Sequence, residues 1–270
     1  MTTRSSLRIV SLSLTIPTLA LLVLVTANPA SLKARSPLPR LACGSDHFTF
    51  ENLSQELAVV QTSGPNIEGP VNIYDISFPL NGLTPAFGYM VSGQPEDAGS
   101  SAGNTLNELE DGPPPTILKT VLAGSNSFSS DCCNEQMVLA PDGSFYHAHY
   151  GDVIQKLQLQ SNKTTVVESF PQSDIVGMAS DGVKIWISNW GTFQVGTWDP
   201  ATNTFTPVFS TPSAAGGLAW DVANGVLWVG MEGGSVVPYD ASGNQLGPGF
   251  QPFGSIPETI DGLAFVPGQP

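Results

Sequence analysis

Positive charge is nearly missing from most of this sequence. Beyond Arg40 there is no arginine and there are four lysines, whereas all 23 acidic residues lie in that part. We therefore expect no nucleic-acid binding, because that affinity comes mostly from lysine and arginine side chains that neutralise phosphates. Phosphate and carboxylate ligands are disfavoured as well, since no guanidinium is present to hold them. A cation, a neutral glycan or a basic protein suits this surface better, although acidity also simply keeps a protein soluble.

Cysteine and recognisable catalytic motifs are also scarce. The three cysteines are odd in number, so a disulfide from Cys43 to Cys132 or Cys133, or a bridge between the latter two, stays open. The sequence has no phosphate-binding GxxxxGKS or GxxxxGKT, no HExxH and no CxxC, and its GxSxG match at Gly99–Gly103 lies in a glycine- and serine-rich stretch. The commonly recognised nucleotidase, metalloprotease and redox signatures are therefore absent, which does not exclude another kind of enzyme.

The N-terminus has the pattern of an export signal. Arg4 and Arg8 precede an uncharged apolar run over residues 9–25, which is interrupted by Pro17 and ends in Val25-Thr26-Ala27. The run is slightly shorter than the roughly 20 residues of a membrane span, and small residues are typical of a cleavage site. We predict a signal peptide over residues 1–27 and secretion to the periplasm or the extracellular space. An uncleaved anchor, or a lipid on Cys43, is the alternative.

The rest of the chain is predicted to be a linker over residues 28–44 and one domain over residues 45–270. Removal of residues 1–27 takes two arginines away and changes the formal net charge from −14 to −16. Frequent glycine and proline with few charges suit an all-β domain. We expect no membrane span after cleavage, and a monomer.

Three stretches align with one another at a period of about 40 to 45 residues. They begin at Met137, Val176 and Gly216, and a further copy begins at Asp261 with DGLAFVP. Each copy predicts four short strands separated by turns. Four strands at this period are typical of a β-propeller blade.

The turns agree from copy to copy. Asp142-Gly143, Asp181-Gly182 and Asn224-Gly225 supply the positive φ that is needed between the first two strands, and Asp199–Asn203 and Asp240–Asn244 close the outer hairpins. Through the DG turn, the LWV-type second strand and the DPATNTF hairpin, the chain resembles bacterial β-propeller proteins of the NHL, YVTN and lyase-like repeat type. The resemblance covers about half of the chain, and it implies a fold and not a reaction.

Residues 71–125 favour another blade. We expect inner strands at Ile76–Phe78 and Phe87–Val91 and an outer strand at Thr116–Leu122. A flexible acidic insertion is predicted over residues 93–115, which are rich in glycine, serine and proline.

The two ends of the chain are predicted to share a blade. His47–Glu51 and Glu56–Gln61 have the pattern of strands that would complete the blade begun at Asp261. We therefore predict an all-β propeller of about five four-stranded blades that closes between its N-terminal and C-terminal strands. A larger ring is the alternative.

Candidate functional residues follow from this blade pattern. The first strand of a blade begins, and the second ends, at the same face, so residues at these points converge. The possible metal ligands there are Glu135, Asp174, Asp261 and His149. Their oxygen atoms suit Ca²⁺, and the histidine also admits Zn²⁺ or Mn²⁺. A metal ion there would polarise an ester or lactone.

The same face has side chains suited to ligand binding. These are Trp190, Tyr150, Asn189 and Glu232. Tyr146, Trp186 and Trp228 recur at one repeat position and are predicted to be core. His147 is predicted to pack in the interior rather than to bind a metal ion.

Three hypotheses for the function remain. The first is a non-catalytic module that binds a protein, glycan or polymer, which repeats without a catalytic motif favour. The alternative is a metal-dependent hydrolase, lactonase or lyase at the channel mouth. Propellers of the gluconolactonase type are similar in general plan, but their motifs are not found here residue for residue. A purely structural role in an envelope or matrix is a third hypothesis.

Overall fold

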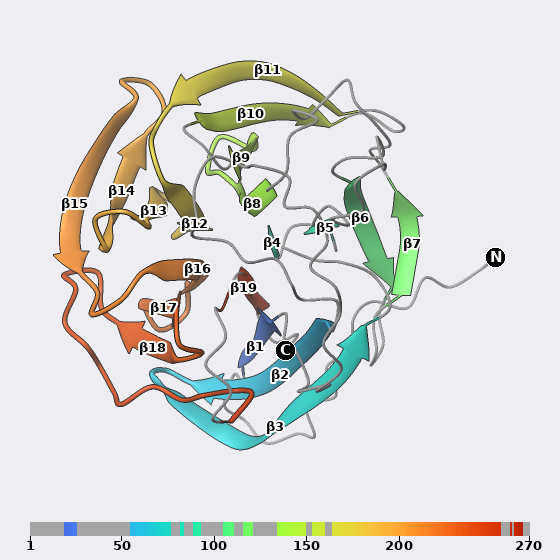
Figure 1. Ribbon diagram of the computed structural model, residues 1–270, viewed down its shortest axis with the longest axis vertical. Coiled ribbons are helices and arrows are strands. Elements are labelled where there is room, and N and C mark those ends of the chain that lie inside the picture. Colours follow the sequence, from blue (N-terminus) through green and yellow to red (C-terminus); the bar gives the residue numbers. More distant parts are fainter. Residues whose placement is uncertain are drawn as a thin grey trace, which may run out of the picture.

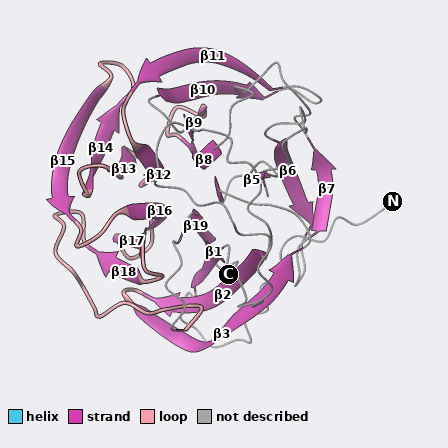
Figure 2. Ribbon diagram, in the orientation of Figure 1, coloured by secondary structure: helices cyan, strands magenta, loops and turns pink. Residues whose placement is uncertain are grey.

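The computed structural model describes residues 19–25, 55–76, 82–83, 89–92, 105–110, 116–120, 134–149, 153–159, 164–254, 260 and 262–266. Over these residues the fold is all β, with five antiparallel sheets arranged around a common centre (Figure 1). Figure 2 shows that strands and loops make up all of this part of the chain. It contains no helix long and apolar enough to span a membrane.

Two sheets confirm the predicted four-stranded units. Sheet C consists of β8 (Asn134–Leu139), β9 (Phe145–His149), β10 (Val153–Leu159) and β11 (Thr164–Pro171). Sheet D consists of β12 (Ile175–Ser180), β13 (Ile185–Asn189), β14 (Gln194–Asp199) and β15 (Thr204–Ser210). In both sheets, strands that follow one another in the sequence are neighbours, as in a meander of hairpins.

Sheet E has three strands, so the prediction of a fourth strand in this copy is wrong. It consists of β16 (Ala215–Asp221), β17 (Val226–Met231) and β18 (Val236–Tyr239). Between β18 and Gly254, the structure has only isolated bridges, Val236 to Phe250 and Tyr239 to Gln245. Pro248 has no N–H for a ladder. Gly249 has a φ of 74°, which a regular strand does not have.

Sheet A joins the two ends of the chain. Its strand order is β19 (Gly262–Val266), β1 (Leu19–Val25), β2 (Gln55–Ser63) and β3 (Asn66–Ile76). The predicted strand at Glu56–Gln61 is confirmed as part of β2. The predicted strand at His47–Glu51 lies outside the described residues, and β1, which falls within the predicted signal peptide, pairs with both β19 and β2.

Sheet B differs in part from the predicted blade. It consists of β4 (Gly82–Leu83), β5 (Tyr89–Ser92), β6 (Thr105–Glu110) and β7 (Thr116–Thr120). The predicted strands at 87–91 and 116–122 overlap β5 and β7, whereas Ile76 ends β3 in sheet A. β6 lies inside the predicted flexible insertion. Leu106 and Leu109 are three residues apart, so the sequence does not show the two-residue alternation that is typical of a strand. The register shifts between Glu108 and Leu109.

The repeated glycine explains how the sheets approach the centre. The inner strand β12 contacts β8 and β16, and β16 contacts β19. A Cβ on Gly177 in β12 would lie 2.7 Å from the carbonyl oxygen of Gly216, and one on Gly217 in β16 would lie 3.0 Å from the Leu263 nitrogen. Gly177 and Gly217 occupy the same position in their copies, so the repeat keeps glycine where neighbouring backbones nearly touch.

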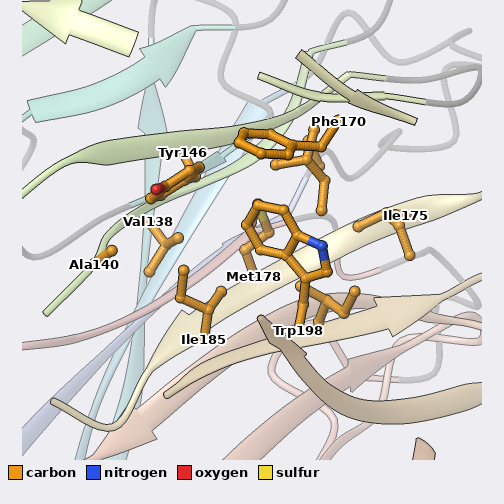
Figure 3. Close-up of a cluster of buried hydrophobic side chains, with 11 residues drawn as sticks. Val138, Ala140, Tyr146, Phe170, Ile175, Met178, Ile185 and Trp198 are labelled. Atoms are coloured by element: carbon orange, nitrogen blue, oxygen red, sulfur yellow. The ribbon is translucent and has the colours of Figure 1, made fainter. Parts of the chain in front are cut away.

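Aromatic and aliphatic side chains fill the space between sheets C and D (Figure 3). The Tyr146 and Trp198 rings meet edge to face, with centroids 5.3 Å apart. Tyr146, Trp186 and Trp228 are all buried, which confirms the prediction that this repeat position is core. His147 is also fully buried, as expected for an interior side chain.

Candidate functional site

The strand registers bring the predicted functional positions to one end of the sheets. Ile175 pairs with Asn189 in sheet D, Asn134 with His149 in sheet C and Ala215 with Met231 in sheet E. We call this end the Asn189 end. The opposite end, which carries the turns between the first and second strands of sheets C, D and E, we call the Asp181 end.

Local turns use most of the polar groups of Asn189. Its amide nitrogen donates to the Ser173 carbonyl at 2.9 Å, and its oxygen accepts from the Thr192 backbone N–H at 2.8 Å and from the Thr192 hydroxyl at 2.9 Å. These bonds hold the loops around β13 in place. A ligand contact with Asn189 would have to replace one of them.

Asp174 and Glu232 are exposed at the Asn189 end. Asp174 has a φ of 56°, and its carbonyl accepts a hydrogen bond from the Trp190 backbone N–H at 2.7 Å. The backbone of Glu232 donates to the Ala214 carbonyl at 2.8 Å. A backbone hydrogen bond therefore holds each residue at this end, where both are exposed.

The Trp190 side chain is only 6% exposed and lies in a cluster with Val176 and Ala214. Stacking on a glycan requires an accessible ring face, so this side chain would have to move to bind one. Its predicted part in ligand binding stays a prediction, as does that of Tyr150, which lies outside the described residues.

The predicted metal site falls largely outside the described residues. Asp261 is not described, and of Glu135 and His149 only the backbone is. Among the side chains that the structure does describe, no group of three histidine, cysteine or acidic residues is arranged to hold a metal ion. The metal site, and with it the hydrolase, lactonase or lyase hypothesis, therefore stays a prediction.

The centre between the sheets is occupied by the Gln136 side chain, which is 1% exposed. Its amide nitrogen donates to the carbonyls of Leu218 and Leu263, both at 2.6 Å. Its oxygen accepts from the backbone N–H groups of Leu218 at 2.7 Å and Met178 at 3.2 Å. One side chain from β8 thus ties together the inner strands β12, β16 and β19, and the sequence analysis did not identify it.

A groove of about 590 Å³ lies at the Asp181 end, where sheets C and D meet. This volume is within the range of about 300 to 1,000 Å³ that is typical of ligand sites. The floor includes Ala140, Ile185 and Trp198, which also belong to the core cluster of Figure 3. The rest of the lining is polar, charged or at least partly exposed: Pro141, Asp142, Val183, Lys184, Thr197, Asp199, Pro200, Thr202, Thr204 and Thr206.

Two aspartates of the groove also shape turns, as the sequence predicted for these positions. The Asp142 carboxylate accepts from the backbone N–H and the hydroxyl of Ser144 at 2.9 and 3.0 Å. The Asp199 carboxylate accepts from the Ala201 N–H and the Thr202 hydroxyl, both at 2.9 Å. Because each carboxylate oxygen has more than one lone pair, these bonds leave acceptor sites at both residues.

Some of the charged side chains at the groove form an ion pair and others do not. Lys156 forms an ion pair with Asp142 at 3.5 Å. Partial burial acts to raise the pKa of Asp142, but the hydrogen bonds from Ser144 and the Lys156 charge hold this pKa below its ordinary value. Over the part of the chain that is described, Asp199 and Lys184 have no ionic partner within 4.0 Å. Among the described side chains, the Asp199 carboxylate therefore has no opposite charge beside it.

Sequence reasoning missed this groove. Its walls come from turns of two different copies, and only packing brings them together. One signal was available, because Val183 follows the Asp181-Gly182 turn and is therefore an apolar residue at a turn tip. It is 80% exposed.

No protein-family model matches the sequence, and no curated protein matches it significantly. Among solved structures, it is similar to a chain of a nidogen/laminin complex, with 11% identity and a TM-score of 0.54, over 94% of this chain and 100% of that one. This similarity supports a propeller-like all-β fold. The chain is also similar to the glutaminyl cyclase of Myxococcus xanthus, with 20% identity and a TM-score of 0.36, over 42% of this chain. The match spans 49% of the cyclase chain.

Proposed function

We propose that this protein is an exported, non-catalytic β-propeller module that binds another protein. The observation that carries the proposal is the groove at the Asp181 end, which combines a firm apolar floor with exposed hydroxyl and charged groups. The similar chain belongs to a nidogen/laminin complex, which supports protein binding as the function of a propeller-like fold of this kind. An apolar centre within a polar rim is typical of a protein-binding surface.

The binding function is tested by capture from a complex mixture. The protein without residues 1–27 is immobilised, and exported proteins of the source organism are passed over it and measured by mass spectrometry. A true partner is enriched saturably, is displaced by excess soluble protein and is not retained by the heat-unfolded chain. Absence of any such protein would reject the function.

The export proposal makes a separate prediction. Because small residues end the apolar run at Ala27, we expect the exported protein to begin at Asn28, as measured by N-terminal sequencing. Cleavage there also removes β1, which pairs between β19 and β2. An exported protein that still begins at Met1 would show that these residues remain in sheet A and that the signal-peptide prediction is wrong.

A further inference from the structure

The groove at the Asp181 end has groups that match a polypeptide backbone. Thr197 pairs with Thr206 across β14 and β15, and Asp199 pairs with Thr204. Over the described part of the chain, the Thr197 and Thr206 hydroxyls have no hydrogen-bond partner, and Thr206 is exposed. A hydroxyl both donates and accepts hydrogen bonds. The Thr197 and Thr206 hydroxyls can therefore bind the alternating C=O and N–H groups of an extended chain.

The groove is lined by two carboxylates, Asp142 and Asp199, and by one ammonium group, Lys184, and its unpaired carboxylate favours a positive side chain on that chain. Asp199 carries a negative charge without an ionic partner among the described side chains, and Asp142 keeps free acceptor sites beside Lys156. The whole protein has a formal net charge of −14, which attracts a basic partner from a distance. A guanidinium also makes stronger, bidentate bonds with a carboxylate than an ammonium does.

The apolar part of the rim suits the stems of the same side chains. Val183 is 80% exposed, and Pro141 and Pro200 lie on the same groove. Arginine and lysine place their methylene stems on apolar surface while their charged groups stay hydrated. Val183 and Asp199 line the same groove. The valine can therefore contact the methylene stem of a basic side chain while the aspartate contacts its charged group.

We propose that this groove binds an extended, arginine-bearing segment of the partner protein. The proposal rests on the proposed function and names the surface and the chemistry of the partner. The peptide backbone lies along the threonine hydroxyls, and a basic side chain reaches Asp199 across Val183.

The probe is an octapeptide in which arginine alternates with valine, and its binding is measured by fluorescence polarisation. We expect saturable binding at one site, and no binding of the same peptide with glutamate in place of arginine. Val183→Arg should weaken binding by about tenfold or more, because it places a like charge in the groove. Its control is Val222→Arg, at an exposed valine (63%) in the corresponding turn of sheet E, which should leave binding unchanged.

A second pair of variants tests the carboxylate. Asp199→Asn should weaken binding of the arginine peptide several-fold. Asp240→Asn removes the same charge from the matching hairpin of sheet E, where Asp240 accepts from Ser242 and Asn244, and should have no effect. An equal loss in both variants would show attraction by overall charge alone and would overturn the proposal. Tighter binding of a neutral oligosaccharide, lost in Val183→Arg, would overturn it as well.

The outcomes for the groove and for the function can be told apart. A partner captured equally well by the wild-type protein and by Val183→Arg would reject the groove while the binding function stands. Groove-specific binding of the arginine peptide without any captured partner would reject the function and leave the groove intact.

Discussion

Replacing Gln136 with methionine is expected to lower the free energy of unfolding by about 4 kcal/mol. The substitution keeps the length of the side chain but leaves four buried backbone groups of β12, β16 and β19 without this partner. A buried polar group that loses its hydrogen bond costs about 1 to 3 kcal/mol. Since these groups lie on three different strands, adjustment of one strand cannot satisfy them all. Urea denaturation followed by tryptophan fluorescence measures the change.

The control for this variant is Gln155→Met. Gln155 is also buried, at 8% exposure, but its amide oxygen has no hydrogen-bond partner among the described residues. Removal of a polar group that is poorly satisfied costs little, so we expect a change below about 1 kcal/mol. Similar losses in the two variants would mean that the Gln136 hydrogen bonds do not hold the inner strands together.

Replacing Gly177 with alanine is expected to destabilise the protein by about 3 kcal/mol. The new Cβ would lie 2.7 Å from the Gly216 carbonyl oxygen and 2.9 Å from the Leu218 side chain. The first of these is backbone, which does not yield by a change of rotamer. Strands β12 and β16 would have to separate, and a thermal melt should show a clear fall in Tm.

Gly247→Ala is the matched comparison. A Cβ there would lie 3.5 Å from its nearest neighbour, a carbon of Pro238, which is ordinary contact. Alanine also reduces the conformational freedom of the unfolded chain, so we expect no loss of stability. If Gly177→Ala is equally neutral, close approach of the inner strands is not why the repeat keeps glycine.

The parts of the fold that the sequence predicted are those with strong local signals. Asp142-Gly143 and Asp181-Gly182 set turns whose geometry depends on the residues themselves. The aromatic side chain that recurs at Tyr146, Trp186 and Trp228 identifies a position of the repeat that is buried in each copy. In contrast, β6 has no strict alternation, because a register shift accommodates its two leucines. The prediction of a fourth strand in sheet E was wrong because Pro248 and Gly249 do not allow a regular strand at that place in the copy.

The candidate site was harder to predict for a different reason. Sequence reasoning selected carboxylates and aromatic residues at strand ends, where Asn189 turns out to be engaged in turns and Trp190 in packing. The groove instead depends on residues of two copies. Pro141 belongs to the copy that begins at Met137, whereas Val183 and Asp199 belong to the next one. Such a neighbourhood arises from the packing of two sheets, and no local pattern in the sequence encodes it.

Sheet A also determines when the protein finishes folding. β2 is synthesised early, yet its sheet includes β19, which leaves the ribosome only after all the other sheets have been made. Pairing between segments so far apart in the sequence is slow. Until β19 has been synthesised, β1 has only β2 to pair with, so sheet A can be completed only after the other described sheets.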